Sequence, residues 1–166
     1  MLDTKLREVK AGRKKTMPGE GKMTVRQILK VKGGGAVVTI APEATLAEAA
    51  GVLAARRIGA LVVTHDGRQV AGILSERDIV RQLGAEGAGC LTRRVQEVMT
   101  ARIVTCTEDD TAESVMQKMT DGRFRHMPVT AGGAMVGLIS IGDVVKARLD
   151  ELAMEKDALT GMIMGL

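Results

Sequence analysis

The stretch Gly72-Ile73-Leu74-Ser75-Glu76-Arg77-Asp78 decides the fold of this chain, because it occurs twice. The second copy is Gly137-Leu138-Ile139-Ser140-Ile141-Gly142-Asp143. In each copy an apolar run leads into Ser-x-x-Asp, which is typical of a strand followed by a helix that a serine caps and an acid in the first turn stabilises. A motif repeated in this way predicts two copies of one structural unit.

The sequence around each copy repeats as well. Val38-Thr39-Ile40 corresponds to Val104-Thr105-Cys106, and Val63-Thr64 corresponds to Val129-Thr130. Each copy predicts a strand, a helix, a β-hairpin and a second helix, and we expect an α/β (α+β) fold of two βαββα repeats. The expected elements are Ala36–Ile40, Leu46–Arg57, Ala60–Thr64, Val70–Leu74 and Glu76–Leu83, then Ile103–Cys106, Ala112–Asp121, His126–Thr130, Ala134–Ile139 and a helix from Ile141.

The remaining segments set the expected boundaries. We expect a basic arm over residues 1–23, repeats over 24–84 and 94–149, a Gly-rich linker over 85–93 and a helical tail over 150–166. Short helices at Thr24–Lys30 and Arg94–Met99 should precede the two repeats. Gly84–Gly89 is predicted to be a flexible linker, because it lacks the lysine and the Ser/Thr of a phosphate-binding P-loop.

The amino-acid composition bears on whether the chain binds nucleic acid. Aromatic residues make up only 1% of the chain, which argues against stacking on single-stranded nucleic acid. Residues 1–32 carry ten Lys or Arg against three acids, so the rest of the chain is mildly acidic. We expect this arm to be solvated, and the alternative is contact with nucleic acid or another anionic surface.

The sequence contains few signals that would place the chain in a particular compartment or in a membrane. Cys90 and Cys106 have no metal-ligand spacing and fit a reducing compartment, and the N-terminus has no apolar signal core. We therefore expect a cytoplasmic protein with no metal site. No apolar run is long enough to span a membrane.

The duplicated order, the two Gly-Ser-Asp motifs and Arg123-Phe124-Arg125-His126-Met127-Pro128-Val129 together resemble a pair of CBS domains, the module named after cystathionine β-synthase. The resemblance covers about Thr24 to Leu149. It implies two clefts across a pseudo-twofold axis that bind adenine nucleotides. It also implies that Asp78 and Asp143 hold ribose hydroxyls, and that Ser75 and Ser140 contact ribose or phosphate. Helix capping alone also accounts for these residues, and both interpretations stay open here.

The resemblance implies a different residue set for each cleft. Cleft one would combine Ser75, Arg77, Asp78, Ile103, Arg125, His126, Met127 and Pro128. Cleft two would combine Val37, Ile58, Gly59, Ala60, Ser140, Gly142 and Asp143. The first set contains arginines that suit a phosphate, so we expect AMP, ADP or ATP there. The second set contains no cation, so cleft two should stay empty or take an uncharged adenosine portion. NAD(H) could place one half in each cleft.

We do not expect an enzyme, because the sequence has no P-loop, nucleophile elbow or metal-ligand cluster. The expected role is a sensor that acts on a separate effector protein. The resemblance and the apolar tail, with Leu152, Leu159 and Ile163, favour a homodimer, and the alternative is a tail that folds back on its own repeat. Nucleic acid is the competing partner, through the basic arm.

Overall fold

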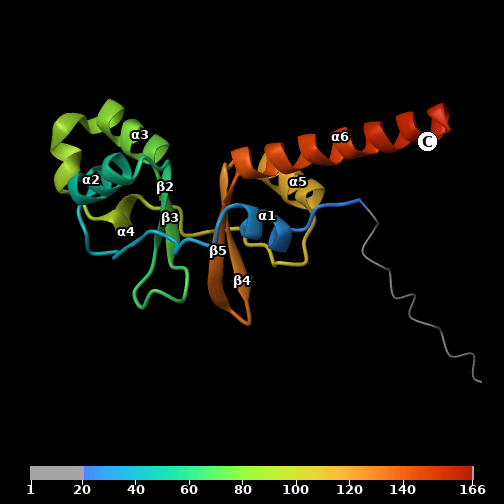
Figure 1. Cartoon of the computed structure of the whole chain (residues 1–166). Coiled ribbons are helices and arrows are strands. Elements are labelled where there is room, and N and C mark those ends of the chain that lie inside the picture. The colour runs from blue at the N-terminus through green and yellow to red at the C-terminus, as the bar shows by residue number, and fades with distance from the viewer. Residues whose placement is uncertain (1–20, 166) are drawn as a thin grey trace, which may run out of the picture.

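The computed structural model describes residues 21–165, so residues 1–20 of the expected basic arm and Leu166 lie outside the described part. The two repeats lie side by side, with the hairpins at the centre and the longer helices on the outside (Figure 1). The elements are α1 Val25–Val31, β1 Thr39–Ile40, α2 Leu46–Arg56, β2 Ala60–Val63, β3 Gly72–Ser75, α3 Glu76–Glu86, the 3₁₀ helix η1 Gly87–Thr92, α4 Val95–Val98, α5 Ala112–Gly122, β4 His126–Ala131, β5 Ala134–Ser140 and α6 Ile141–Met164.

The sheets are smaller than expected. In the first repeat β1 runs parallel to β2, and β2 pairs antiparallel with β3. In the second repeat only β4 and β5 form a sheet, and the expected strand Ile103–Cys106 is reduced to one bridge between Cys106 and Val129. The expected strand Ala36–Ile40 likewise keeps only its last two residues. Most of the residues that leave the ladder instead line the clefts described below: Ala36, Val37, Val38, Ile103 and Val104.

The predicted helix caps are confirmed. The Ser75 hydroxyl accepts a hydrogen bond from the Asp78 backbone N–H at 3.3 Å, and the Asp78 carboxylate accepts one from the Ser75 N–H at 2.9 Å. Ser140 and Asp143 form the same reciprocal pair at the start of α6. Ser-x-x-Asp is therefore a capping box in both repeats.

The two short helices are exchanged between the repeats. α1 precedes the first repeat, but its Val25 and Ile28 are buried in the core of the second, in the cluster that contains Ile139. α4 precedes the second repeat, but its Val95 is buried in the core of the first. The core of each repeat therefore contains a short helix that is adjacent to the other repeat in the sequence. This exchange interlocks the two repeats into one module.

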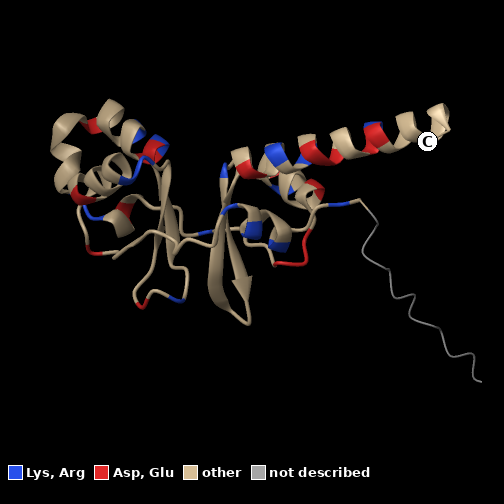
Figure 2. Cartoon of the chain, in the orientation of Figure 1, with Lys and Arg blue, Asp and Glu red and all other residues tan. Residues whose placement is uncertain are grey.

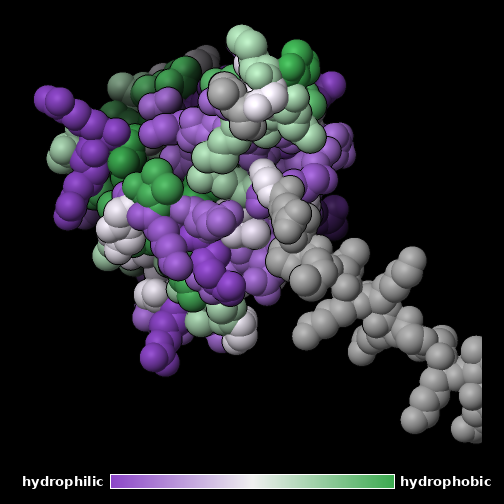
Figure 3. All heavy atoms as spheres, turned by 45° about the vertical axis from the view of Figure 1, so that its right-hand side comes forward, coloured by the Kyte–Doolittle hydropathy of each residue, from purple (hydrophilic) through white to green (hydrophobic). Residues whose placement is uncertain are grey.

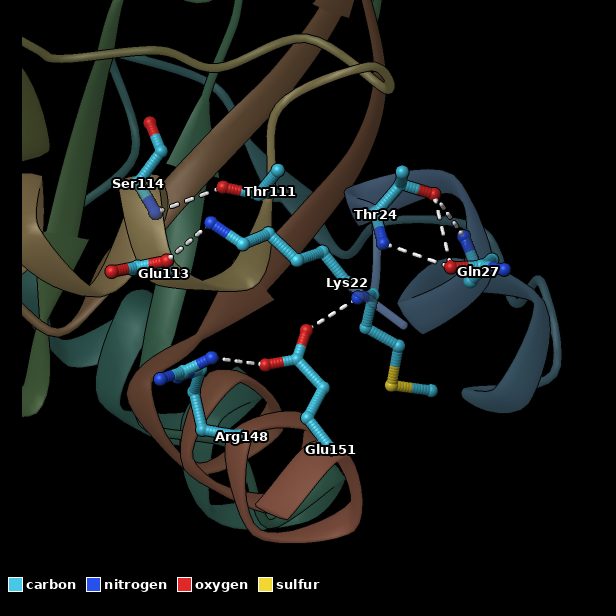
Figure 4. Close-up of polar contacts among 9 residues, drawn as sticks. Lys22, Thr24, Gln27, Thr111, Glu113, Ser114, Arg148 and Glu151 are labelled. Atoms are coloured by element: carbon cyan, nitrogen blue, oxygen red, sulfur yellow. Dashed lines mark hydrogen bonds and ion pairs between the residues drawn. The ribbon is translucent and has the colours of Figure 1, made fainter. Parts of the chain in front are cut away.

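A buried carboxylate ties α1 to α6. Glu151 is 3% exposed, and it accepts hydrogen bonds from the Met23 backbone N–H and from the Arg148 guanidinium. Lys22 adds an ion pair with Glu113 on α5 at 3.1 Å (Figure 4). The N-terminal end of α1 is thereby held against both long helices of the second repeat.

The prediction of a flexible linker at Gly84–Gly89 is wrong. α3 continues to Glu86, and η1 follows it directly. Cys90 is buried, and Arg93 forms an ion pair with Glu86 at 2.7 Å. Among the three glycines of this run only Gly87 has a positive φ, 71°, and it ends α3; the other two adopt ordinary backbone angles.

The tail is a continuation of α6 and does not fold back. α6 extends from Ile141 to Met164 without a break and projects away from the body (Figure 1). Residues 152–160 are all exposed. An amphipathic helix with no packing partner is only marginally stable in water, so this segment calls for a partner.

Candidate functional site

Cleft one lies between the repeats and encloses about 480 Å³. The first turn of α3 forms one wall, and the segments before and at the start of β4 form the other. Six of the eight residues predicted for it line the cleft: Ser75, Arg77, Asp78, Ile103, Arg125 and His126. Met127 and Pro128 do not, because they are buried in β4 behind it. Their assignment to the lining is therefore wrong.

Cleft one is rich in arginine. Its lining contains five arginines and two acids: Arg77, Arg81, Arg102, Arg123 and Arg125, with Glu76 and Asp78. Figure 2 shows charged residues of both signs at the start of α3. Arg81 and Arg102 were not predicted, and neither was Phe124. Their positions did carry a signal: Arg81 follows Asp78 by one turn, Arg102 precedes Ile103, and Phe124 is the single aromatic residue of the chain.

The Asp78 carboxylate is held by groups of its own repeat. One oxygen accepts from the Ser75 N–H at 2.9 Å and from the Ser75 hydroxyl at 3.0 Å. The other oxygen lies 3.6 Å from Arg81, whose side chain is 74% exposed. A hydroxyl can rotate and an exposed arginine can move, so this carboxylate can accept hydrogen bonds from a ligand.

Cleft two encloses about 450 Å³ on the other side of His126. It is lined by Val37, Ile58, Gly59, Ala60, Ser140 and Asp143, as predicted. Gly142 does not line it. The two clefts share Gly59, His126 and Ser140, so they adjoin each other.

The prediction that cleft two has no cation is wrong. Lys32 lines it, and its Nζ lies 2.8 Å from the Asp143 carboxylate and donates to the Leu138 carbonyl at 2.9 Å. Sequence reasoning missed Lys32 because it directly follows α1, which the expected boundaries assign to the first repeat. The exchange of α1 carries it to the second.

The charges in cleft two shift two pKa values. Burial tends to raise the pKa of Asp143, but the hydrogen bonds from Lys32 and Ser140 outweigh it and hold the pKa below the ordinary value. Burial, together with the positive charge of Lys32, lowers the pKa of His126 against the opposing effect of Asp143. The lowered pKa favours the neutral imidazole of His126, which presents one donor and one acceptor.

Two arginines have left-handed backbone conformations. Arg57 ends α2 with φ 53°, and Arg123 ends α5 with φ 55°. They are equivalent positions of the two repeats, but only Arg123 lines a cleft. Nothing in their side-chain chemistry favours this conformation, which glycine adopts more readily.

Two interlocked repeats with adjoining clefts between them define a tandem-repeat module. The sequence profile of the CBS domain matches residues 35–85 and 95–150, and the chain belongs to the CBS domain family as a tandem pair.

Known proteins of this family are similar over most of the chain. The mitochondrial CBS domain-containing protein CBSX3 of Arabidopsis thaliana is 34% identical over 149 residues, which are 86% of this chain and 72% of that protein. The crystal structure of the CBS-domain protein ATU1752 from Agrobacterium tumefaciens is 46% identical, with a TM-score of 0.73 over 78% of this chain and 97% of that one. The chain spans only about a quarter of another relative, the Arabidopsis protein CBSCBSPB3.

A more distant pair has been solved with ligands. The CBS domain pair of protein MJ0100, in complex with 5'-methylthioadenosine and S-adenosyl-L-methionine, is 23% identical, with a TM-score of 0.66 over 75% of this chain and 94% of that one. It shares the fold with this chain. Within residues 21–165, no helix is long and apolar enough to cross a membrane.

Proposed function

We propose that the chain is a non-catalytic regulatory module that binds an adenine nucleotide in cleft one. The observation that carries this proposal is the set of five arginines facing a carboxylate at a helix N-terminus. Arginine binds phosphate through paired hydrogen bonds, and a helix N-terminus favours an anion. A carboxylate in this position can accept hydrogen bonds from ribose hydroxyls. AMP, ADP and ATP contain both groups.

The apolar part of cleft one suits the base. Ile73, Ile103, Val104 and Phe124 line it, and the Phe124 ring offers a flat face on which a purine can stack. The adenosine-containing ligands of the MJ0100 pair support adenine as the base. For cleft two we propose an uncharged adenosine portion. NAD(H) could occupy both clefts, because they adjoin each other.

We further propose that the module reports nucleotide level to a separate effector protein in the cytoplasm. The matching family model and the similar Arabidopsis protein CBSX3 are both described by the CBS domain, which supports a regulatory role. The second candidate function is nucleic-acid association through the basic arm, which the ten Lys and Arg of residues 1–32 favour. Binding that weakens steeply with salt and is lost on deleting residues 1–22 would support that alternative.

We propose a homodimer that forms through α6. Five of its exposed apolar residues follow the alternating spacing of four and three that defines a coiled-coil seam, with Lys156 at the fourth of the six positions: Val145, Leu149, Leu152, Leu159 and Ile163. The buried face of α6, with Val144 and Ala147, lies on a different side. The seam is therefore free to pack against a second copy.

The position of Lys156 favours antiparallel helices. A parallel pair would place two Lys156 side chains against each other in the seam, which like charges oppose. An antiparallel pair centred near Met154 places Lys156 against Leu152 of the partner subunit. It also places Leu149 against Leu159 of the partner subunit.

Thermal unfolding with different nucleotides tests the proposed ligand. AMP at about 100 times its dissociation constant should add roughly 2.7 kcal/mol, which is on the order of several degrees for a chain of this size. GMP and CMP should add less. Equal shifts with all three would indicate anion binding without recognition of the base, and no shift with AMP would contradict the proposal.

A further inference from the structure

We infer that Lys32 is an internal gate of cleft two: its ammonium group competes with a ribose for Asp143, so adenosine binds there tightly only when Lys32 is released. This inference rests on the proposed function, in which each cleft holds a ribose at its Ser-x-x-Asp carboxylate. It adds a built-in difference in affinity between two clefts of similar size.

Lys32 occupies an acceptor position on Oδ2 of Asp143 that a ribose hydroxyl could otherwise use. One oxygen of Asp143 accepts both the Ser140 N–H at 2.9 Å and the Lys32 ammonium at 2.8 Å. A carboxylate oxygen has about two acceptor positions, so this oxygen is saturated. The ammonium also neutralises the carboxylate and takes up space in the cleft that it lines.

Cleft one shows the same carboxylate without such a gate. The matching oxygen of Asp78 accepts only from Ser75, whose hydroxyl can turn toward a ligand. The cation near Asp78 is Arg81, at 3.6 Å on the same helix. The clefts therefore differ in whether a side chain from another element already holds the carboxylate.

The surroundings of Lys32 allow it both to bind Asp143 and to be displaced from it. It caps the C-terminal end of α1, which Val25 and Ile28 anchor in the core of the second repeat. Its side chain is 44% exposed, so it can swing into solvent while α1 stays in place. An ion pair with this much exposure is weak enough to be displaced by a ligand.

Adenosine titration of variants tests the gate. All variants carry Asp78→Ala, so that the calorimetric signal comes from cleft two. Lys32→Ala should bind adenosine up to about fivefold more tightly than the same background with Lys32 intact, since a half-exposed ion pair is worth at most about that factor. Lys32→Gln, which keeps the length without the charge, should show an intermediate gain. Lys30→Ala, an exposed lysine of the same helix, should show none.

Two further variants identify the cause. Adding Asp143→Ala to Lys32→Ala should abolish the gain, and Lys32→Arg should show no gain because it keeps the ion pair. The gate would be overturned if Lys32→Ala bound adenosine no more tightly than the Asp78→Ala background. If the wild-type chain still bound AMP, the proposed function would stand. If the wild-type chain binds neither AMP nor adenosine, the proposed function fails and the gate fails with it.

Discussion

Arg57 and Arg123 adopt the same left-handed backbone at equivalent positions, yet only Arg123 faces a cleft. Arg57→Gly and Arg123→Gly should each stabilise the fold by up to about 1 kcal/mol, because glycine relieves the strain at positive φ. Urea unfolding measures this effect. Only Arg123→Gly should also weaken AMP binding, since it removes a cation from cleft one. Equal AMP affinity in the two variants would exclude Arg123 from the phosphate site.

The Lys32–Asp143 ion pair predicts a pH dependence of stability. The pKa of Asp143 is lower in the folded chain than its ordinary value of 3.8. The pair therefore stabilises the fold above that value, and its contribution is lost as the pH falls through the lower, folded pKa. Wild type should be more stable than Lys32→Met at pH 7, and the difference should shrink below pH about 3.8. A difference that stayed constant over this range would contradict the assignment.

The site residues that sequence reasoning found are those inside the repeated motifs. Ser75 and Asp78 follow from the capping pattern, and the resemblance to CBS pairs implied Ile103 and Arg125. Lys32 could not be found this way, because nothing local to it reveals that α1 packs with the other repeat. Met127 and Pro128 were misassigned because both are buried within β4 and do not reach the cleft.

The exchanged helices α4 and α1 explain why each of the two repeated motifs begins with a glycine. A Cβ on Gly72 would lie 2.6 Å from the Met99 sulfur and 2.9 Å from the Thr100 carbonyl oxygen. A Cβ on Gly137 would meet only the end of the Leu29 side chain, at 2.9 Å. Gly72 therefore leaves room for the end of α4, and Gly137 leaves room for α1. Only at Gly72 would the added Cβ meet backbone.

This difference gives a prediction for the pair of glycines. Gly72→Ala should destabilise the fold by about 1–3 kcal/mol, the usual effect of overpacking, because the Thr100 carbonyl cannot move without shifting the chain. Gly137→Ala should cost less, because Leu29 can change its rotamer. Urea midpoints of the two variants measure the difference. An equal loss in both would show that the backbone contact does not decide it.

The order of the elements could be predicted, and their lengths could be predicted only in part. Alternating apolar residues and caps located α2, α3, α5 and both hairpins. Two wrong predictions have a physical origin. A strand was expected at Ile103 and Val104 because β-branched residues favour strands, but these residues face cleft one. A flexible linker was expected around Gly87, but glycines are compatible with a helix when packing supports it.

The projecting half of α6 bears on the assembly of the whole molecule. Figure 3 turns this end of the molecule forward and shows hydrophobic surface at its top. In light scattering, wild type should have a mass of about 35 kDa, twice the chain mass of 17.6 kDa. Leu149→Glu and Leu159→Glu should reduce it to the monomer mass, because each buries a charge against a leucine of the partner subunit.

Met154→Glu is the matched control for the dimer. Met154 is as exposed as the seam residues but lies on the opposite side of α6. This variant should therefore remain dimeric. A wild-type monomer at micromolar concentration, or dissociation by Met154→Glu as well, would contradict an interface along the proposed seam.

Calorimetric titration with AMP tests the central claim, that cleft one is the phosphorylated-nucleotide site. Asp78→Ala should weaken AMP binding roughly ten- to a hundredfold, because it removes a charged acceptor of ribose hydroxyls. Asp143→Ala should leave it nearly unchanged, although both substitutions remove a capping-box partner from their helix. Loss of AMP binding in Asp143→Ala but not in Asp78→Ala would contradict the account, and so would AMP binding that neither substitution affects.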